Sequence, residues 1–178
     1  VVGGQPIIFL WASPLTLNDP ATALFKWTSA TGWVQMVNLT GTEDGAAVKT
    51  DGVHVAYEIA SFHSPSDATL PVYRTEVRPV AGGAATILSN DGSFPTMDLS
   101  LVDGVLSYSE RSGDRPIRAW SPELGAVALS PSQAGNFWRS GFDVGSGLYA
   151  YYGLVPGEPA GIYTWNGKTG VSKLLVES

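Results

Sequence analysis

The residues best suited to chemistry in this chain are carboxylates in its turns. The chain has 16 acidic and 10 basic residues, which gives a formal net charge of −6. Carboxylate and carbonyl oxygens are the ligands that calcium prefers, and an acidic surface attracts cationic partners. Three aspartates are calcium candidates: Asp19, Asp44 and Asp91. The alternative is that they only form turns, because Asn and Asp side chains hydrogen-bond to nearby backbone and no stretch has the spacing of an EF-hand loop.

Histidine and cysteine offer little further chemistry. The sequence has no cysteine, which excludes disulfides, thiolate zinc sites and a cysteine nucleophile. Its two histidines are His54, in a predicted strand, and His63, in a predicted loop. Neither has a second histidine at helical or hairpin spacing, so we expect no histidine metal site and no cofactor other than calcium. His63 remains a residue that could touch a ligand.

The sequence lacks the usual signatures of hydrolases. Residues 1–4, Val-Val-Gly-Gly, resemble the N-terminus of an activated chymotrypsin-type protease. The Gly-Asp-Ser-Gly and Ala-Ala-His segments of that family are absent, and so is a Gly-x-Ser-x-Gly elbow. Folding could still bring two acids together as the carboxylate pair of a glycosidase. Enzymatic activity therefore stays open, although the sequence favours a non-enzymatic protein.

Aromatic side chains are the other group suited to binding, because their faces can stack on sugars or pack against a protein partner. Trp27, Trp120 and Trp165 recur at one position of a repeat and are expected to pack inside the protein. Trp33, Trp138 and Tyr73 fall outside that register and are better candidates for an exposed role. Tyr149, Tyr151 and Tyr152 cannot all line one site, because neighbouring strand residues point to opposite faces.

Glycine landmarks reveal the elements that carry these residues. Four aromatic-rich segments end in turns that close on Gly32, Gly83, Gly125 and Gly170, at intervals of 51, 42 and 45 residues. A second set of glycines comes just before predicted strands that carry an aromatic residue. These glycines are Gly4, Gly52, Gly104 and Gly147. Between the landmarks, short runs rich in β-branched and aromatic residues alternate with turn residues, and no helical pattern is sustained. The two sets indicate one unit of about 45 residues.

A repeat of this length, with four antiparallel strands, is typical of a β-propeller blade. The segment 162–170, Ile-Tyr-Thr-Trp-Asn-Gly-Lys-Thr-Gly, resembles blades of TolB-type and WD-repeat propellers of exported bacterial proteins. The predicted fold is therefore all-β, with a single propeller or propeller fragment formed by about four four-stranded blades. The predicted blades are residues 1–38, 39–90, 91–130 and 131–178. The alternative is a β-sandwich fold.

Two of these units depart from the pattern. Arg78 stands where the other three units have tryptophan. Too little chain precedes Pro6 for an innermost strand, so the first unit is expected to have about three strands. Such a propeller could close within one chain as a four-bladed ring, between two copies as an eight-bladed ring, or with further blades of a longer protein.

The long connections between second and third strands should gather on one face, together with those between blades. This face is predicted to carry an excess of acidic residues. The candidate partner-binding or ligand-binding residues are His63, Tyr73, Trp138, Trp33, Asp67 and Asp114.

Composition narrows the range of partners. The few basic residues are dispersed, so a nucleic-acid partner is not expected, and no apolar run is long enough to cross a membrane. We expect a non-enzymatic module that binds a protein partner or associates with itself. The resemblance implies an extracytoplasmic location, whether periplasmic, cell-surface or secreted, in a bacterium. The alternatives are a propeller that binds or cleaves glycans, and the propeller part of a larger exported hydrolase.

Overall fold

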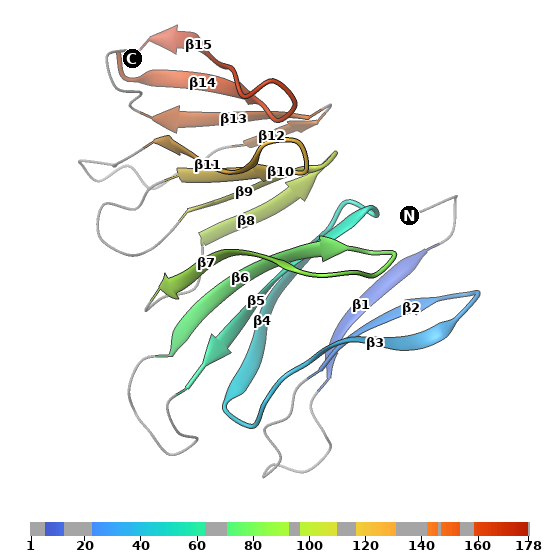
Figure 1. Ribbon diagram of the computed structural model, residues 1–178. Coiled ribbons are helices and arrows are strands. Elements are labelled where there is room, and N and C mark those ends of the chain that lie inside the picture. Colours follow the sequence, from blue (N-terminus) through green and yellow to red (C-terminus); the bar gives the residue numbers. More distant parts are fainter. Residues whose placement is uncertain are drawn as a thin grey trace. The chain divides into compact units, whose positions relative to one another are not determined.

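The computed structural model describes residues 6–12, 23–62, 71–92, 97–109, 117–130, 142–145, 147–153 and 159–177. These residues form 15 β-strands and no helix, so the all-β prediction is confirmed. The strands pair into four antiparallel sheets, each formed by consecutive strands (Figure 1). Short alternating segments bounded by turn residues explain why neighbouring strands pair with each other.

The first sheet has three strands within the described residues, as expected for the first unit. They are β1 (Ile7–Ala12), β2 (Ala23–Thr28) and β3 (Gly32–Asn38), in that order. The second sheet has four strands, which are β4 (Glu43–Thr50), β5 (His54–Ser61), β6 (Val72–Pro79) and β7 (Thr86–Gly92). Because β2 carries Trp27 at the repeated position, β1, β2 and β3 correspond to the second, third and fourth strands of the other sheets.

The third sheet contains β8 (Met97–Val102), β9 (Val105–Ser109), β10 (Ile117–Ser121) and β11 (Gly125–Ser130). The fourth contains β12 (Phe142–Gly145), β13 (Leu148–Gly153), β14 (Gly161–Asn166) and β15 (Ser172–Glu177). The chain divides into two compact units, Val1–Pro95 with the first two sheets and Thr96–Ser178 with the last two. The predicted blade limits and the single propeller domain stay predictions.

The described glycines of both landmark sets lie in the connections between strands or at the start of a strand. Gly52, between β4 and β5, has a φ of +91°, and Gly32, at the start of β3, has a φ of +65°. Such angles strain any residue with a Cβ, which explains why glycine recurs there. The same positive φ occurs at the landmark glycines of the other sheets, which are Gly83, Gly104, Gly125, Gly147 and Gly170.

Each unit has its own hydrophobic core between its two sheets. In the first unit the core contains Leu24, Val55, Tyr57 and Ile59, and residues of β1 pack against it. In the second unit, side chains of β9, β10 and β11 meet side chains of β13 and β14. There Tyr151 stacks on Tyr149 and Tyr163, with ring centroids 6.1 and 5.6 Å apart. Tyr152, the next residue along β13, is only half-buried, so the prediction of opposite faces is confirmed.

Candidate functional site

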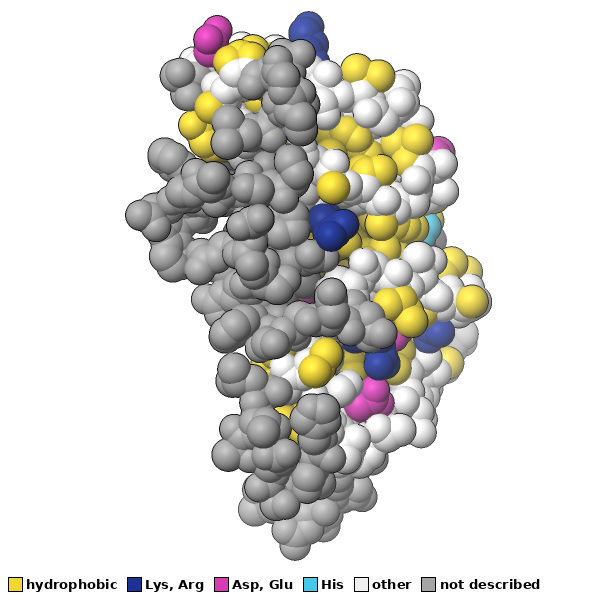
Figure 2. Space-filling model, turned by 60° about the vertical axis from the view of Figure 1, so that its left-hand side comes forward, with side chains coloured by type: hydrophobic (Ala, Val, Ile, Leu, Met, Phe, Trp, Pro, Cys, Tyr) yellow, Lys and Arg dark blue, Asp and Glu magenta, His cyan; other side chains and the backbone are white. Residues whose placement is uncertain are grey.

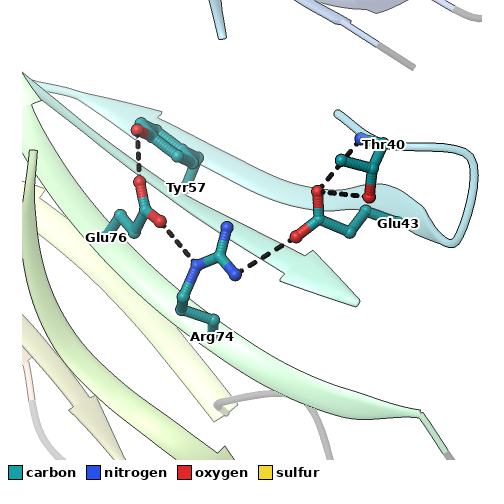
Figure 3. Close-up of polar contacts among 5 residues, drawn as sticks. All are labelled: Thr40, Glu43, Tyr57, Arg74 and Glu76. Carbon is teal, nitrogen blue, oxygen red and sulfur yellow. Dashed lines mark hydrogen bonds and ion pairs between the residues drawn. The ribbon is translucent and has the colours of Figure 1, made fainter. Parts of the chain in front are cut away.

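Five polar side chains of the first unit form a connected network, hereafter the polar cluster (Figure 3). The Tyr57 hydroxyl donates to Glu76 Oε2 at 2.7 Å, and Arg74 Nε donates to Glu76 Oε1 at 2.6 Å. Arg74 also donates from Nη1 to Glu43 Oε1 at 3.2 Å. Pairing of β5 with β6 places Tyr57 directly opposite Glu76, and Arg74 follows on the same face two residues away.

The connection between β3 and β4 holds the fifth member of the polar cluster. The backbone N and the Oγ1 of Thr40 both donate to Glu43 Oε2, at 3.0 and 3.1 Å. The backbone N of Glu43 donates in return to the Thr40 carbonyl at 2.9 Å. The turn that leads into β4 therefore fixes the Glu43 carboxylate, which in turn holds Arg74.

The electrostatics of the polar cluster favour its charged pairs. Burial alone would raise the pKa of Glu43, but the Thr40 hydrogen bonds and the charge of Arg74 outweigh burial, so this pKa is lowered. Burial lowers the pKa of Arg74, but the two carboxylates prevail and raise it. Burial, followed by the hydrogen bond to Glu76, raises the pKa of the Tyr57 phenol well above its usual value.

The polar cluster is poorly suited to acid catalysis. Glu43 and Glu76 both hold the same guanidinium, and their side chains are 15% and 11% exposed. A general acid needs a raised pKa, whereas that of Glu43 is lowered. The cluster therefore ties β4, β5 and β6 together, close to the long connection between β5 and β6.

The repeated third-strand position has a consistent direction in the two units. In the second sheet, Arg78 donates to the main-chain carbonyl oxygen of Met36 in the first sheet. In the fourth sheet, Trp165 belongs to the core shared with the third sheet. In both cases the side chain points to the preceding sheet of its own unit. Trp120, in the third sheet, lies opposite Leu106 on the face turned away from the fourth sheet.

Trp27 has the same direction, and it therefore points away from the second sheet. Its cross-strand partners, Ile8 and Trp33, share this face, and so do Leu10 and Phe25. We call this surface of the first sheet the leading face. Ile8, Leu10 and Trp33 are 48%, 49% and 52% exposed. The prediction that Trp27 is packed like the other repeated tryptophans is therefore only partly right, because it is half-buried, whereas Trp120 and Trp165 are buried.

A hollow of about 400 Å³ lies at the tight-turn end of the first unit. Its walls are mainly apolar, and they include Ile7, Val53 and Val80. Lys26 also lines the hollow, and its ammonium group donates to the Val80 carbonyl at 2.8 Å. This bond and that of Arg78 both use a cation to join the first sheet to the second.

Two of the predicted partner-binding residues lie in the described part of the chain. Trp33 is exposed on the leading face, and Tyr73 is half-buried on the face of β6 opposite Arg74. Neither belongs to the polar cluster. Four predicted residues lie outside the described residues: His63, Asp67, Asp114 and Trp138. Their roles stay predictions.

The calcium candidates are only partly described. Asp44 lies in β4, and its Oδ1 accepts from the backbone N of Gly45 at 2.8 Å. Asp91 lies in β7, and Asp19 is outside the described residues. In the ranges that the structure describes, no group of three or more His, Asp or Glu side chains could hold a metal ion. Calcium binding therefore stays a prediction.

Sequence reasoning missed most of the polar cluster because its members come from distant parts of the chain. Arg74 is 31 residues from Glu43, and Tyr57 is 19 residues from Glu76. One signal was present, since Arg74, Glu76 and Arg78 alternate within a strand and must share one face. Three charged groups on the core side of a strand require partners.

Charged side chains are few among the coloured side chains of the surface drawn in Figure 2, and in its lower half some of opposite sign lie close together. This agrees with a charged content of only 15%. Among the described residues, no helix is long and apolar enough to cross a bilayer.

No protein-family model matches the sequence, and no curated relative matches it either. Among solved structures, acylaminoacyl peptidase from Pyrococcus horikoshii matches 98% of this chain with 26% of its own, at 12% identity and a TM-score of 0.54. At this identity the likeness shows the fold alone. The chain has a β-propeller fold.

Two further solved propeller proteins resemble the chain less closely in TM-score. TolB from Acinetobacter baumannii matches 98% of this chain with 44% of its own, at 13% identity and a TM-score of 0.49. A puromycin-hydrolyzing peptidase from Mycobacterium tuberculosis matches 97% with 27% of its own, at 17% identity and a TM-score of 0.47. The propeller chain therefore spans less than half the length of each of these proteins.

Proposed function

We propose that the chain is a non-enzymatic, extracytoplasmic propeller module that binds a protein through the leading face of its first sheet. The observation that carries this proposal is the exposure of Ile8, Leu10 and Trp33 around Trp27. In the fourth sheet the corresponding tryptophan, Trp165, is 2% exposed because another sheet covers it. An apolar sheet face of this kind is a favoured surface for protein association.

The low charge of the leading face supports a protein partner. Its described residues are aliphatic, aromatic or neutral polar, and exposed tryptophan is typical of interface centres. The extracytoplasmic location is proposed from the resemblance of the 162–170 segment to blades of exported proteins. The non-enzymatic role is proposed because the carboxylates of the polar cluster are held by Arg74.

Site-specific labelling tests this proposal, because a chain without cysteine gives a unique site when one is introduced. Leu10→Cys should react with a thiol reagent, at low protein concentration, about as fast as the exposed control Val53→Cys. An environment-sensitive fluorophore at position 10 should then shift to the blue when a protein docks. Labelling of Leu10→Cys that is roughly a hundredfold slower than the control would contradict the proposal, since the face would already be covered.

A second candidate is the propeller part of a larger exported hydrolase. It is supported by the match to 26% of the length of a peptidase. In that case the leading face would contact the remainder of the same polypeptide. The complete reading frame tests this candidate: a hydrolase domain joined to these blades would support it, and a frame without one would exclude it.

A further inference from the structure

The exposed leading face of the first sheet has a counterpart on the fourth sheet. We call the surface of the fourth sheet that points away from the third its trailing face. Leu148, Ile162 and Val176 lie on it, since Ile162 pairs with Val176 and alternates with the core residues Tyr163 and Trp165. Leu148, Ile162 and Val176 are 36%, 39% and 57% exposed.

The packing inside each unit shows which surfaces fit together. The face that carries Trp165 covers Val105, Ile117 and Ala119 of the third sheet, which form the trailing face of that sheet. In the first unit, the face of the second sheet that carries Arg78 covers the side of the first sheet that points away from Trp27. In each sheet, we call the face that carries the repeated third-strand residue the leading face and the opposite one the trailing face. In both units, the leading face of the later sheet therefore packs on the trailing face of the earlier sheet.

We infer that the leading face of one chain binds the trailing face of the fourth sheet of a second copy. This inference rests on the proposed function and names the partner of its surface. The trailing faces of the first and third sheets are covered within their units, and Ala56 and Val77 on that of the second sheet are buried. Among the described residues, only the fourth sheet therefore has an exposed apolar trailing face.

Charge supports the same pairing. Among the described residues, the leading face of the first sheet carries no charged side chain. The trailing face of the fourth sheet carries one, Lys173, which lies opposite Thr164. Contact between the two faces buries no pair of like charges, and an ammonium group can lie over the ring of an exposed tryptophan such as Trp33. Because the two faces differ, the association is head-to-tail and closes when the rotation between copies permits.

Sedimentation velocity and light scattering of the purified chain test this inference. We expect a mass of twice the 18.7 kDa of one chain, or a larger multiple, at roughly 100 µM. Leu10→Lys on the leading face and Ile162→Lys on the trailing face should each raise the dissociation constant at least about tenfold. Val53→Lys, in an exposed turn, is the matched control and should leave the mass unchanged.

Mixing the two variants gives the sharpest result. Each retains one intact face, so an equimolar mixture of Leu10→Lys and Ile162→Lys should form a dimer at a concentration at which each variant alone is monomeric. A dimer that survives Ile162→Lys but not Leu10→Lys would mean that two leading faces meet, which overturns the inference. Should a lysine variant fail to fold, Trp33→Gln and Val176→Gln replace the pair.

The two proposals can fail separately. A wild-type monomer at high concentration with rapid labelling of Leu10→Cys overturns self-association and leaves the leading face free for another protein. A wild-type monomer with slow labelling overturns both, since the leading face is then covered within the chain. Labelling of Leu10→Cys that is rapid at low protein concentration, and slows at the concentrations at which the mass doubles, supports both proposals.

Discussion

The guanidinium of Arg78 donates a hydrogen bond to the main-chain carbonyl oxygen of Met36, in the neighbouring sheet. The other three sheets place tryptophan at this position, and in the fourth sheet the Trp165 ring packs on the third sheet. The second sheet uses a cation and a carbonyl oxygen instead. Arginine at this position is therefore an alternative way of joining sheets.

Replacement of Arg78 should consequently weaken the first unit. Arg78→Met leaves the Met36 carbonyl without this donor, and we expect a loss of about 1–3 kcal/mol in the free energy of unfolding, measured in urea. Arg78→Lys retains a cationic donor and should lose less. Equal losses for both variants would contradict a role for the hydrogen bond.

Acid should destabilise the first unit through Glu43. Its pKa is lowered from the ordinary value of 4.5 in the folded chain, so its contribution is present above pH 4.5 and is lost as the pH falls through the folded pKa. Glu43→Gln should remove this part of the pH dependence. Urea unfolding between pH 3 and pH 7 measures how the free energy of unfolding depends on pH. The same pH dependence in Glu43→Gln as in the wild type would contradict the prediction.

Alkali should act on the same unit through Tyr57. Its pKa is raised when the chain is folded, so its contribution is complete below the unfolded value of 10.0 and is lost as the pH rises towards the folded pKa. In Tyr57→Phe, the free energy of unfolding should fall less steeply with pH above pH 10. At pH 7 this variant should lose roughly 1 kcal/mol of that free energy because the hydrogen bond to Glu76 is absent. Burial also raises the pKa of Tyr151, but this residue lies in the other unit, so Tyr151→Phe should leave the alkaline unfolding of the first unit unchanged.

Gly45 allows the first and second sheets to approach closely. A Cβ at this position would overlap the indole ring of Trp11, which itself meets the ring of Tyr57 edge-on at 6.0 Å. Gly45→Ala should lower the free energy of unfolding by roughly 1–3 kcal/mol, because the indole ring of Trp11 must shift. Addition of Trp11→Leu should relieve the overlap, so the double variant should lose less than the sum of the single variants. Strict additivity would show that the two residues do not meet.

The sequence predicted the strands of the repeat well because their signals are local. The landmark glycines mark real strand boundaries, since Gly32 and Gly125 begin β3 and β11, and Gly147 directly precedes β13. The exposure of Trp27 could not be predicted, because burial depends on which sheet covers a face rather than on the residue type. The polar cluster was missed for a related reason, since cross-strand pairing joins residues distant in sequence.

The connections between strands divide the scaffold into two ends with different tolerance for change. Turns such as 51–53 and 103–104 are short and contain glycines with positive φ, whereas residues 62–71 and 110–116 join second to third strands over longer stretches. A peptide inserted into 62–71 lengthens a connection between β5 and β6 that is already long, whereas one placed in 103–104 interrupts the two-residue turn that joins β8 to β9. New binding specificity can therefore be introduced at one end while the other preserves the fold.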